Sequence, residues 1–302
     1  MTWRAKFSVG GLVGLLLIGP IVALDIWLLN VLINQGIRAQ QISFLTFLMG
    51  LVELLSVPVL LVLIYQTASW LTLRYRLDRD GVVVSWFGAE QIIPIRDIQR
   101  IVPGREFGGT VVRRRGLRWP GHERGDVLVP GIGRTRFLAT RPLAEQLLLV
   151  TPGQAFAISP HDPDGFISAF ESRQKLGPNR LLVQTVRRAR WLTWPLWTDQ
   201  TAWVLLGAAV VVNLGLFGYL CLRFPGLNFF LALHFNSMGD PDRIGTKIEL
   251  FALPIIGLII LGTNLGLGLL LYRRERAGSY LLWGAAAVVQ ALFWLAAFSI
   301  VP

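Results

Sequence analysis

Long apolar runs alternate with polar segments along the chain, and five of the runs are long enough to cross a bilayer. They cover residues 9–33, 43–73, 201–222, 250–272 and 280–301. A helix needs about 20 mainly apolar residues to span roughly 30 Å of hydrocarbon. We therefore predict two transmembrane helices in residues 1–73 and three in residues 201–302, on either side of a long polar segment.

The middle segment, residues 74–178, follows the two-residue period of β-strands between Gly and Pro turns. Its run "YRLDRDGVVVSWF" predicts two strands joined by a tight turn at Asp80 and Gly81. The side chains that we expect to be buried are those of Val82, Val84, Trp86, Ile93, Ile95 and Ile98. Several strands followed by one helix predict a small β-barrel or sandwich capped by that helix.

The end of this segment changes to a helical period. In "SPHDPDGFISAFESRQKL", either Asp162 or Asp164 can accept the hydrogen bonds of a helix N-terminus. The apolar residues Phe166, Ile167 and Phe170 then lie on one helical face. We therefore expect this helix to cap the β-rich core.

Three stretches of the middle segment resemble a bacterial pleckstrin-homology (PH) domain. They are "YRLDRDGVVVSWFGAEQIIPIRDIQRI", "RFLAT" and, most specifically, "AISPHDPDGFISAF". The resemblance covers residues 74–174 and implies a seven-stranded, strongly bent antiparallel sheet with a terminal helix. It implies little about a ligand, because the same fold serves the binding of many partners.

The composition agrees with a membrane protein. Of 302 residues, 53% are hydrophobic and 16% are charged, and the mean hydropathy is +0.55, far from the values of ordinary soluble domains. The single cysteine, Cys221, excludes an intramolecular disulfide and a cysteine metal cluster, and we expect no cofactor. The net charge of +11 suits the anionic inner face of a membrane better than nucleic acid in so apolar a chain.

Basic residues are concentrated in alternate flanks of the apolar runs. Arg4 and Lys6 precede the first run, "RYRLDR" follows the second, "VRRAR" precedes the third, and "RRER" separates the fourth from the fifth. Short cytoplasmic flanks are enriched in Lys and Arg. We expect a multi-pass protein of the cell membrane with its N-terminus and middle segment in the cytoplasm and its C-terminus outside.

A basic loop of the middle segment is a candidate for binding lipid headgroups or a partner. Its arginines are Arg113, Arg114, Arg115 and Arg118. Each basic residue beside an anionic bilayer gains about 1 kcal/mol. A solvated loop that merely follows the enrichment of basic residues on the cytoplasmic side is the alternative.

A second basic stretch, within residues 179–200, combines arginine with tryptophan. The residues concerned are Arg187, Arg188, Arg190, Trp191, Trp194 and Trp197. Arginine near phosphates and tryptophan at headgroup level suit an amphipathic helix that lies in the membrane interface. We therefore predict an interfacial segment here that fastens the middle segment to the membrane.

Polar residues within the apolar runs are candidates for a polar path. The acidic ones are Asp25 and Glu53, and the amides are Asn213, Asn264 and Gln290. A charge at the bilayer centre costs at least about 3 kcal/mol, so such residues are often functional. Hydrogen bonding between helices, or a position near the headgroups, is the alternative.

Two glycine pairs in the apolar runs have the four-residue spacing that permits two helices to approach closely. They are Gly10 with Gly14 and Gly262 with Gly266.

The connector between the third and fourth runs, "HFNSMGDPDRIGTKIEL", is polar and rich in turn residues. It fails as a calcium loop of the EF-hand type, because Ile244 and Phe251 stand where liganding side chains are needed. His234 has no second His or Cys nearby, so we predict neither a zinc site nor a catalytic residue. Gly, Asp and Pro at these positions predict a rigid loop outside the membrane that satisfies its own polar groups.

The connector also resembles the signature "P.HFN..G..D..G.K......P" of a membrane family of unknown function found at the front of Sdp-immunity-type proteins. The matching residues are His234, Phe235, Asn236, Gly239, Asp242, Gly245, Lys247 and Pro254. The proline expected before the histidine is absent. The resemblance implies an outward-facing recognition or structural loop. Some of those proteins protect cells from a secreted toxic peptide, but here a PH-like segment precedes the motif and stands in place of their immunity domain.

These patterns favour a non-enzymatic membrane protein, in which a PH-like scaffold or sensor inside the cell is coupled to a recognition loop outside it, in envelope-stress or peptide-immunity signalling. The expected partners are the lipid bilayer, anionic headgroups, and a membrane protein or peptide, but not nucleic acid. The alternative is a small transporter or permeability factor that uses Glu53 and Asp25. An enzyme is the third and least favoured hypothesis. No pair of a nucleophile and a base can be placed on one side of the membrane.

Overall fold

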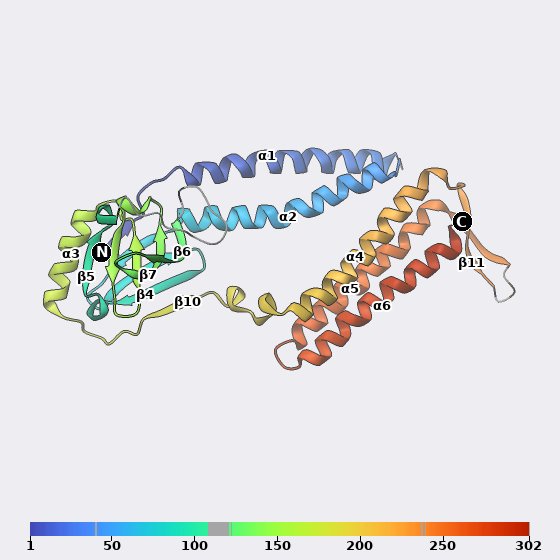
Figure 1. The fold of residues 1–302 in the computed structure, drawn as a ribbon. Coiled ribbons are helices and arrows are strands. Elements are labelled where there is room, and N and C mark those ends of the chain that lie inside the picture. The colour runs from blue at the N-terminus through green and yellow to red at the C-terminus, as the bar shows by residue number, and fades with distance from the viewer. Residues whose placement is uncertain (40, 108–120, 122, 237, 239, 302) are drawn as a thin grey trace. The chain divides into compact units, whose positions relative to one another are not determined.

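The computed structural model describes residues 1–302 except residues 40, 108–120, 122, 237, 239 and 302. For Ile37 and Phe235 it describes the backbone alone. The chain divides into two compact units (Figure 1). The module unit comprises Met1–Ala23 and Val57–Trp194, and the bundle unit comprises Leu24–Ser56 and Pro195–Pro302.

Five helices of the described chain are long and apolar enough to cross a membrane, as the five apolar runs predict. They are α1 (Gly10–Val31), α2 (Phe44–Leu71), α4 (Gln200–Arg223), α5 (Ala252–Leu271) and α6 (Arg276–Ile300). Helices suit hydrocarbon because each backbone N–H finds its acceptor within the same segment. The chain continues beyond α1 as a π-helix over Leu32–Arg38.

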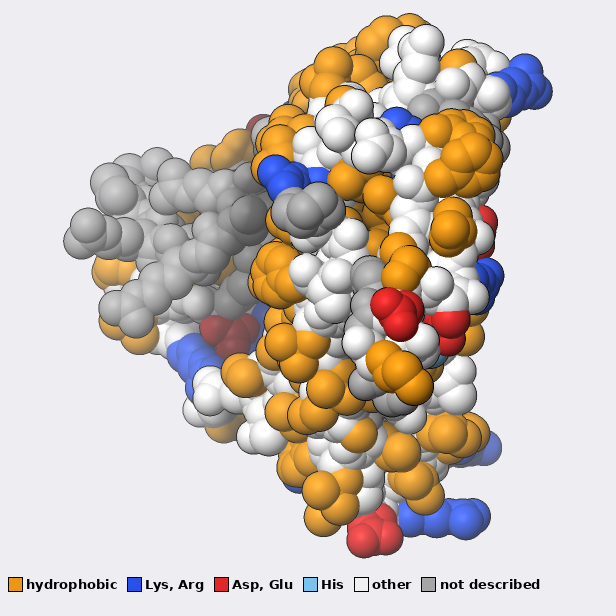
Figure 2. Space-filling model, turned by 90° about the vertical axis from the view of Figure 1, so that its right-hand side faces the viewer, with side chains coloured by type: hydrophobic (Ala, Val, Ile, Leu, Met, Phe, Trp, Pro, Cys, Tyr) orange, Lys and Arg blue, Asp and Glu red, His pale blue; other side chains and the backbone are white. Residues whose placement is uncertain are grey.

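The surfaces of these helices are apolar. Leu16, Leu61, Val211 and Leu270 are among many large hydrophobic side chains that are exposed, and Figure 2 shows hydrophobic side chains over much of the visible face. Soluble monomers rarely expose contiguous apolar surface of this extent. The helices therefore indicate a membrane protein.

The module unit contains a β-rich module of two sheets and one helix. The first sheet has the order β1-β2-β3-β4-β10 and consists of β1 (Thr2–Arg4), β2 (Arg74–Leu77), β3 (Gly81–Trp86), β4 (Ala89–Pro94) and β10 (Thr185–Arg188). The second has the order β5-β8-β9-β7-β6 and consists of β5 (Arg100–Pro103), β6 (Glu123–Val129), β7 (Gly133–Ala139), β8 (Leu147–Val150) and β9 (Ala155–Ile158). The helix α3 (Pro163–Leu176) follows β9.

The main core of the module joins both sheets and α3, and it confirms the predicted burial pattern. All six side chains expected to be buried belong to it, namely those of Val82, Val84, Trp86, Ile93, Ile95 and Ile98. Phe166 and Phe170 of α3 are buried in the same core, and Ile167 packs against it. Of the two candidate caps, Asp162 accepts a hydrogen bond from the N–H of Gly165 at 3.0 Å.

The sheets differ from the seven-stranded antiparallel sheet that the PH resemblance implies. Among the described residues, β7 and β9 pair in parallel, because the turn after β8 folds β9 back into the place between β8 and β7. Moreover, β1 and β10 come from outside residues 74–178 and pair with β2 and β4. An edge strand offers unpaired backbone groups, and these two strands satisfy them.

The helix predicted within residues 179–200 is wrong. Thr185–Arg188 form β10, and Arg190–Thr193 and Pro195–Thr198 form two short 3₁₀ turns. The edge of β4 has backbone N–H and C=O groups that need hydrogen-bond partners, and only an extended segment can pair with them. Residues 185–188 therefore form a strand and not a helix. Arginine and tryptophan composition alone did not reveal the pairing.

Near the module, α1 and α2 pack closely. A Cβ atom added to Gly11 would meet the ring of Trp70, and one added to Gly14 would meet the side chain of Thr67. Trp70 Nε1 also donates to Ser8 Oγ at 2.7 Å. Gly14 of the first predicted glycine pair thus makes a helix contact, and Gly11 makes another.

In the bundle unit, α4, α5 and α6 lie side by side (Figure 1) around a buried amide pair. Asn213 Nδ2 of α4 donates to Gln290 Oε1 of α6 at 2.8 Å and to the carbonyl of Pro254 at 3.0 Å. Gln290 Nε2 donates to the carbonyl of Gly257 in α5 at 2.8 Å. Asn213 and Gln290 therefore serve hydrogen bonding between helices, the alternative that the sequence left open.

The close contacts of α5 lie at other glycines than predicted. A Cβ atom on Gly257 would meet Gln290, and one on Gly268 would meet the ring of Trp283. Gly262 and Gly266 have open space around them and are exposed. The spacing of this second pair permits a close approach, but no described helix approaches these two glycines, because both lie on the outer side of the bundle.

Asp199 ties together one end of the bundle. Its side chain caps α4 by accepting from the N–H of Ala202 at 3.1 Å. It also accepts from the hydroxyls of Tyr272 and Tyr280 at 2.5 Å each. The hydrogen bond from Tyr272, followed by that from Tyr280, lowers the pKa of Asp199 to about 2, so this carboxylate stays charged.

Candidate functional site

The connector between α4 and α5 forms a β-hairpin at the other end of the bundle (Figure 1). Its strands are β11 (Phe230–Phe235) and β12 (Pro241–Thr246). Leu231 and Leu233 pack against a buried cluster that includes Phe251 and Val301. The hairpin and the C-terminal end of α6 therefore share one end of the bundle unit.

The tip of the hairpin is closed by the side chains of the motif. His234 Nδ1 lies 2.6 Å from Asp242 Oδ1 across the two strands, and a carboxylate can only accept in such a bond. Asn236 Oδ1 accepts from the N–H groups of Met238 and Asp240, both at 2.9 Å. Asn side chains often mimic a backbone turn in this way, so these residues fix the chain reversal.

The base of the hairpin is fastened to the bundle by a capping box and a lysine. Glu249 Oε1 accepts from the N–H of Thr246 at 2.9 Å, and Glu249 Oε2 lies 3.1 Å from Arg243 Nη2. Lys247 Nζ donates to the carbonyls of Phe224 and Leu227 at 3.2 and 3.4 Å. Its ammonium also lies 4.5 Å from the centre of the Phe224 ring, a favourable cation–π geometry.

Gly245 lies where the hairpin meets this base. A Cβ atom there would collide with the side chains of Leu233 and Glu249. The structure thus brings His234, Asn236, Asp242, Gly245 and Lys247 into one rigid element, while Gly239 and the side chain of Phe235 lie outside what it describes. Met238 and Ile244 of the same hairpin expose their apolar side chains, at 86% and 68%.

An aromatic and basic collar surrounds the end of α2 that meets the module. Tyr65 of α2 packs edge-on against Phe87 and Trp191, with ring centres 6.0 and 6.3 Å apart. Arg124 lies 4.9 Å over the Trp86 ring and 3.4 Å from the Tyr65 hydroxyl. Such belts are typical of headgroup level. Sequence reasoning missed Tyr65, Phe87 and Arg124. The available signals were a tyrosine near the end of the second apolar run and the Phe87-Gly88 turn shortly after that run.

The predicted basic and aromatic residues of residues 179–200 lie next to this collar. Arg187 and Arg188 are exposed on β10, and Arg190 and Trp191 are exposed just after it, whereas Trp194 is half-buried. Arg187 and Arg188 also line a hollow of about 330 Å³ with Trp86 and Glu90. Arg113, Arg114, Arg115 and Arg118 lie outside the described residues.

An ion cluster stiffens the second sheet of the module. Asp126 of β6 lies 2.6 Å from Arg136 Nε and 2.9 Å from Arg134 Nη2, both of β7. The hydrogen bond from Arg136, together with that from Arg134, lowers the pKa of Asp126 to about 2. Arg136 Nη1 also donates to Gln91 of β4 at 3.2 Å, which links the two sheets.

The acidic residues of the first two spans lie near each other in the bundle unit. Glu53 is close enough to Asp25 for their carboxylates to repel. Among the described residues, none donates a hydrogen bond to Asp25 Oδ1 or Glu53 Oε2, and both atoms are buried. Asn264 is half-buried on α5, and no described hydrogen bond joins it to this pair.

Comparison with known proteins bears on the module. The family model of the bacterial PH domain matches residues 73–174, whereas neither the curated proteins nor the solved structures yielded a match. The matched range begins at the end of α2 and closes within α3, and it includes the core shared by two sheets and a helix. Residues 73–174 are therefore similar to a bacterial PH domain, as the sequence predicts.

Proposed function

We propose that this chain is a non-enzymatic membrane protein whose PH-like module is a cytoplasmic scaffold or sensor coupled to an extracytoplasmic recognition hairpin. The observation that carries this proposal is the construction of the first sheet. β1 ends at Arg4 shortly before α1 begins at Gly10, and β2 begins at Arg74 just after α2 ends at Leu71. β10 forms the other edge and leads toward α4.

This construction supports coupling. The strands β1, β2 and β10, which adjoin α1, α2 and the segment before α4, belong to one hydrogen-bonded sheet, so a ligand that shifts this sheet pulls on these chain ends. Trp3 of β1 also packs edge-on against Phe166 of α3 at 5.2 Å, which ties the N-terminus to the core of the module. We infer that a binding event at the module is transmitted to α1 and α2, because β1 ends and β2 begins within a few residues of these helices.

The proposed sidedness has two supports. The basic flanks favour a cytoplasmic module, because short cytoplasmic flanks are enriched in Lys and Arg, and β1 pairs with β2, so the N-terminus lies on the side of the module. In the bundle unit, Gln35 and Gln41 line one hollow together with Lys247 of the hairpin base. The two connectors that the alternation assigns to the outside therefore meet each other.

The hairpin suits recognition because its frame is fixed while its apolar side chains stay exposed. The resemblance of its motif to the family at the front of Sdp-immunity-type proteins suggests a secreted peptide as the class of ligand. We therefore place the protein in envelope-stress or peptide-immunity signalling.

The inner half of this proposal is tested by hydrogen exchange on the full chain reconstituted in bilayers. Residues 185–194 are expected to exchange several-fold more slowly in bilayers with anionic lipid than in neutral ones, because Arg187 and Arg188 engage the headgroups. The difference should shrink at high salt and disappear in Arg187→Gln/Arg188→Gln.

The control is Lys175→Gln/Arg180→Gln, which removes the same charge from exposed positions at the end of α3 and beyond it. This variant should retain the difference between anionic and neutral bilayers. Equal exchange of residues 185–194 in both bilayers would contradict the headgroup contact.

A second candidate, a small transporter or permeability factor, is favoured by the carboxylates of Glu53 and Asp25. Two nearby acids with unpaired buried oxygens are costly in hydrocarbon unless they exchange a proton or a cation. In proteoliposomes, Glu53→Gln should then abolish proton or cation flux, while Ser56→Ala on the same helix should not. Equal flux in wild type, Glu53→Gln and empty vesicles would reject this candidate.

A further inference from the structure

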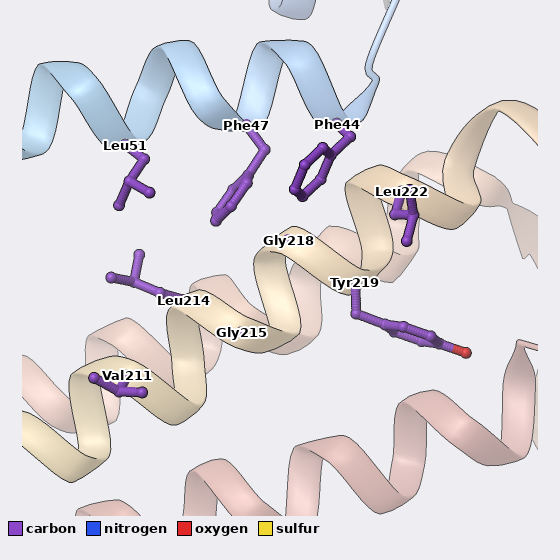
Figure 3. A pocket seen from close by; sticks show the side chains of 9 residues that line it. All are labelled: Phe44, Phe47, Leu51, Val211, Leu214, Gly215, Gly218, Tyr219 and Leu222. Atoms are coloured by element: carbon purple, nitrogen blue, oxygen red, sulfur yellow. The ribbon is translucent and has the colours of Figure 1, made fainter.

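An apolar groove lies between α2 and α4 in the bundle unit. Figure 3 shows side chains of α2 pointing across it toward α4. Its volume is about 500 Å³. It is lined by Phe44, Phe47, Leu51, Val211, Leu214, Gly215, Gly218, Tyr219 and Leu222.

The groove remains open because α4 carries glycine where the helices approach each other. Gly218 presents its backbone to α2 in Figure 3, and a Cβ atom on it would already touch the Phe47 ring at 3.0 Å, whereas a Cβ atom on Gly215 would meet Trp294 of α6. Phe47 packs against the buried cluster of α4, so the walls are fixed. A larger residue at position 218 would displace Phe47 from this wall.

The size of the groove matches one lipid chain. A protein cavity of about 150 Å³ accommodates benzene, so about 500 Å³ accommodates roughly 15 to 20 carbon atoms. A transmembrane helix is about 10–12 Å wide with its side chains and cannot enter a space of this volume. A hydrocarbon chain is therefore the better occupant.

A polar hollow continues the groove at the hairpin end. Its volume is about 390 Å³, and its polar lining residues are Gln35, Gln41, Ser43, Thr46 and Lys247. The two hollows are adjacent, since Ser43 of the polar hollow precedes Phe44 of the groove. An apolar slot that ends in amides, hydroxyls and one ammonium is complementary to an amphiphile.

Lys247 gives this end a positive charge that is held in place. Two of its three N–H donors reach the carbonyls of Phe224 and Leu227, and the ammonium group lines the hollow. The remaining donor can reach an anion, and the Ser43 hydroxyl can add a second donor, whereas Thr46 Oγ1 already donates to the Ser43 carbonyl at 2.7 Å. This donor set suits the phosphate of a lipid headgroup.

We propose that this end of the bundle unit binds one phospholipid with an anionic headgroup, its phosphate at Lys247 and one acyl chain between α2 and α4. The site is separate from the PH-like module and does not depend on which side of the membrane the hairpin faces. The lipid would fix α2 against α4 and support the base of the hairpin.

The test is native mass spectrometry of the full chain in mild detergent, titrated with phosphatidylglycerol and with phosphatidylcholine of the same acyl chains. We expect one molecule of phosphatidylglycerol to bind about fivefold more tightly than phosphatidylcholine, since one lysine near anionic lipid contributes about that factor. Lys247→Gln should abolish the preference, and Lys247→Arg should restore it. Equal affinity of the wild type for both lipids would overturn the proposal.

The groove is tested separately by Leu51→Trp, which fills it. This variant should lose the tight lipid, whereas Leu270→Trp on an exposed face of α5 should retain it. Retention of the lipid by Leu51→Trp overturns the acyl-chain position. A dimer mass that Leu51→Trp abolishes, without any tightly bound lipid, would show that a second copy occupies the groove and would likewise overturn the proposal.

Discussion

Asn213 and Gln290 are fully buried amides in helices that face hydrocarbon, where water cannot replace a lost hydrogen-bond partner. Both residues donate to the backbone of α5, and they also pair with each other. A polar side chain in a span thus has a structural use at these positions, whereas Asp25 and Glu53 have no such partners among the described residues.

Replacing both amides should cost less than the sum of the two single replacements. Asn213→Leu or Gln290→Leu leaves a buried polar group unpaired, which costs about 1–3 kcal/mol. The double variant Asn213→Leu/Gln290→Leu should lose less than the sum of the two, because no partner remains unsatisfied. Reversible unfolding in bicelles measures the free energy of unfolding of all three variants. Strictly additive losses of this free energy would argue against the amide pair.

The carboxylate of Asp126 should make the stability of the module depend on pH. Its folded pKa of about 2 is below the ordinary value near 3.9, so its contribution is present above pH 4 and is lost as the pH falls toward 2. Since the pair is partly exposed, the contribution is about 1 kcal/mol or less. Asp126→Asn should therefore destabilise residues 123–139 more at pH 6 than at pH 2, as measured by hydrogen exchange. An equal difference at both pH values would show that Asp126 acts through its shape alone.

At the scale of elements, the connectors and edges depend on pairing across distance in the sequence. β10 joins β4 over almost a hundred residues of chain, and β1 joins β2 across two spans. The hairpin is more local, and its motif residues act together as turn, cross-strand contact and base.

Asn236→Ala should loosen the tip of the hairpin. The amides of Met238 and Asp240 lose their side-chain acceptor, so their hydrogen exchange should rise about fivefold, the equivalent of one hydrogen bond of about 1 kcal/mol. Asn228→Ala, at an exposed position before β11, is the matched control and should change neither amide. Unchanged exchange in Asn236→Ala would mean that the tip is held by other contacts.

At the scale of the whole molecule, five spans joined by connectors predict opposite sides for the module and the hairpin. Helices α1, α2, α4, α5 and α6 provide the spans, and the basic flanks provide the direction. Both halves of the proposed function depend on this sidedness.

Cysteine labelling measures this sidedness of the module and the hairpin. In a Cys221→Ala background, Met238→Cys should react with a membrane-impermeant maleimide in intact cells, and Leu128→Cys should react only after permeabilisation. Both positions are well exposed, at 86% and 73%, so failure to react reports the membrane and not burial. The reverse pattern would invert the proposed topology.

The sequence alone determined the five helices and the buried positions of the PH-like module. Their signals are local. A run of about 20 apolar residues predicts a membrane span, and an alternating pattern predicts which side chains of a strand are buried, without knowledge of the rest of the chain. For the same reason the cap Asp162 and the apolar face of α3 were predictable from a few neighbouring residues.

Only the tertiary structure decided which distant segments meet. Gly257 and Gly268 contact other helices while Gly262 and Gly266 do not, although all four are glycines of one helix, because the face a helix buries is set by its neighbours. Residues 185–188 became a strand because β4 left an edge to pair, and the groove beside Gly215 and Gly218 exists only where α2 and α4 come together. Strand pairing and helix packing join residues that are far apart in sequence, and a local sequence pattern does not identify such partners.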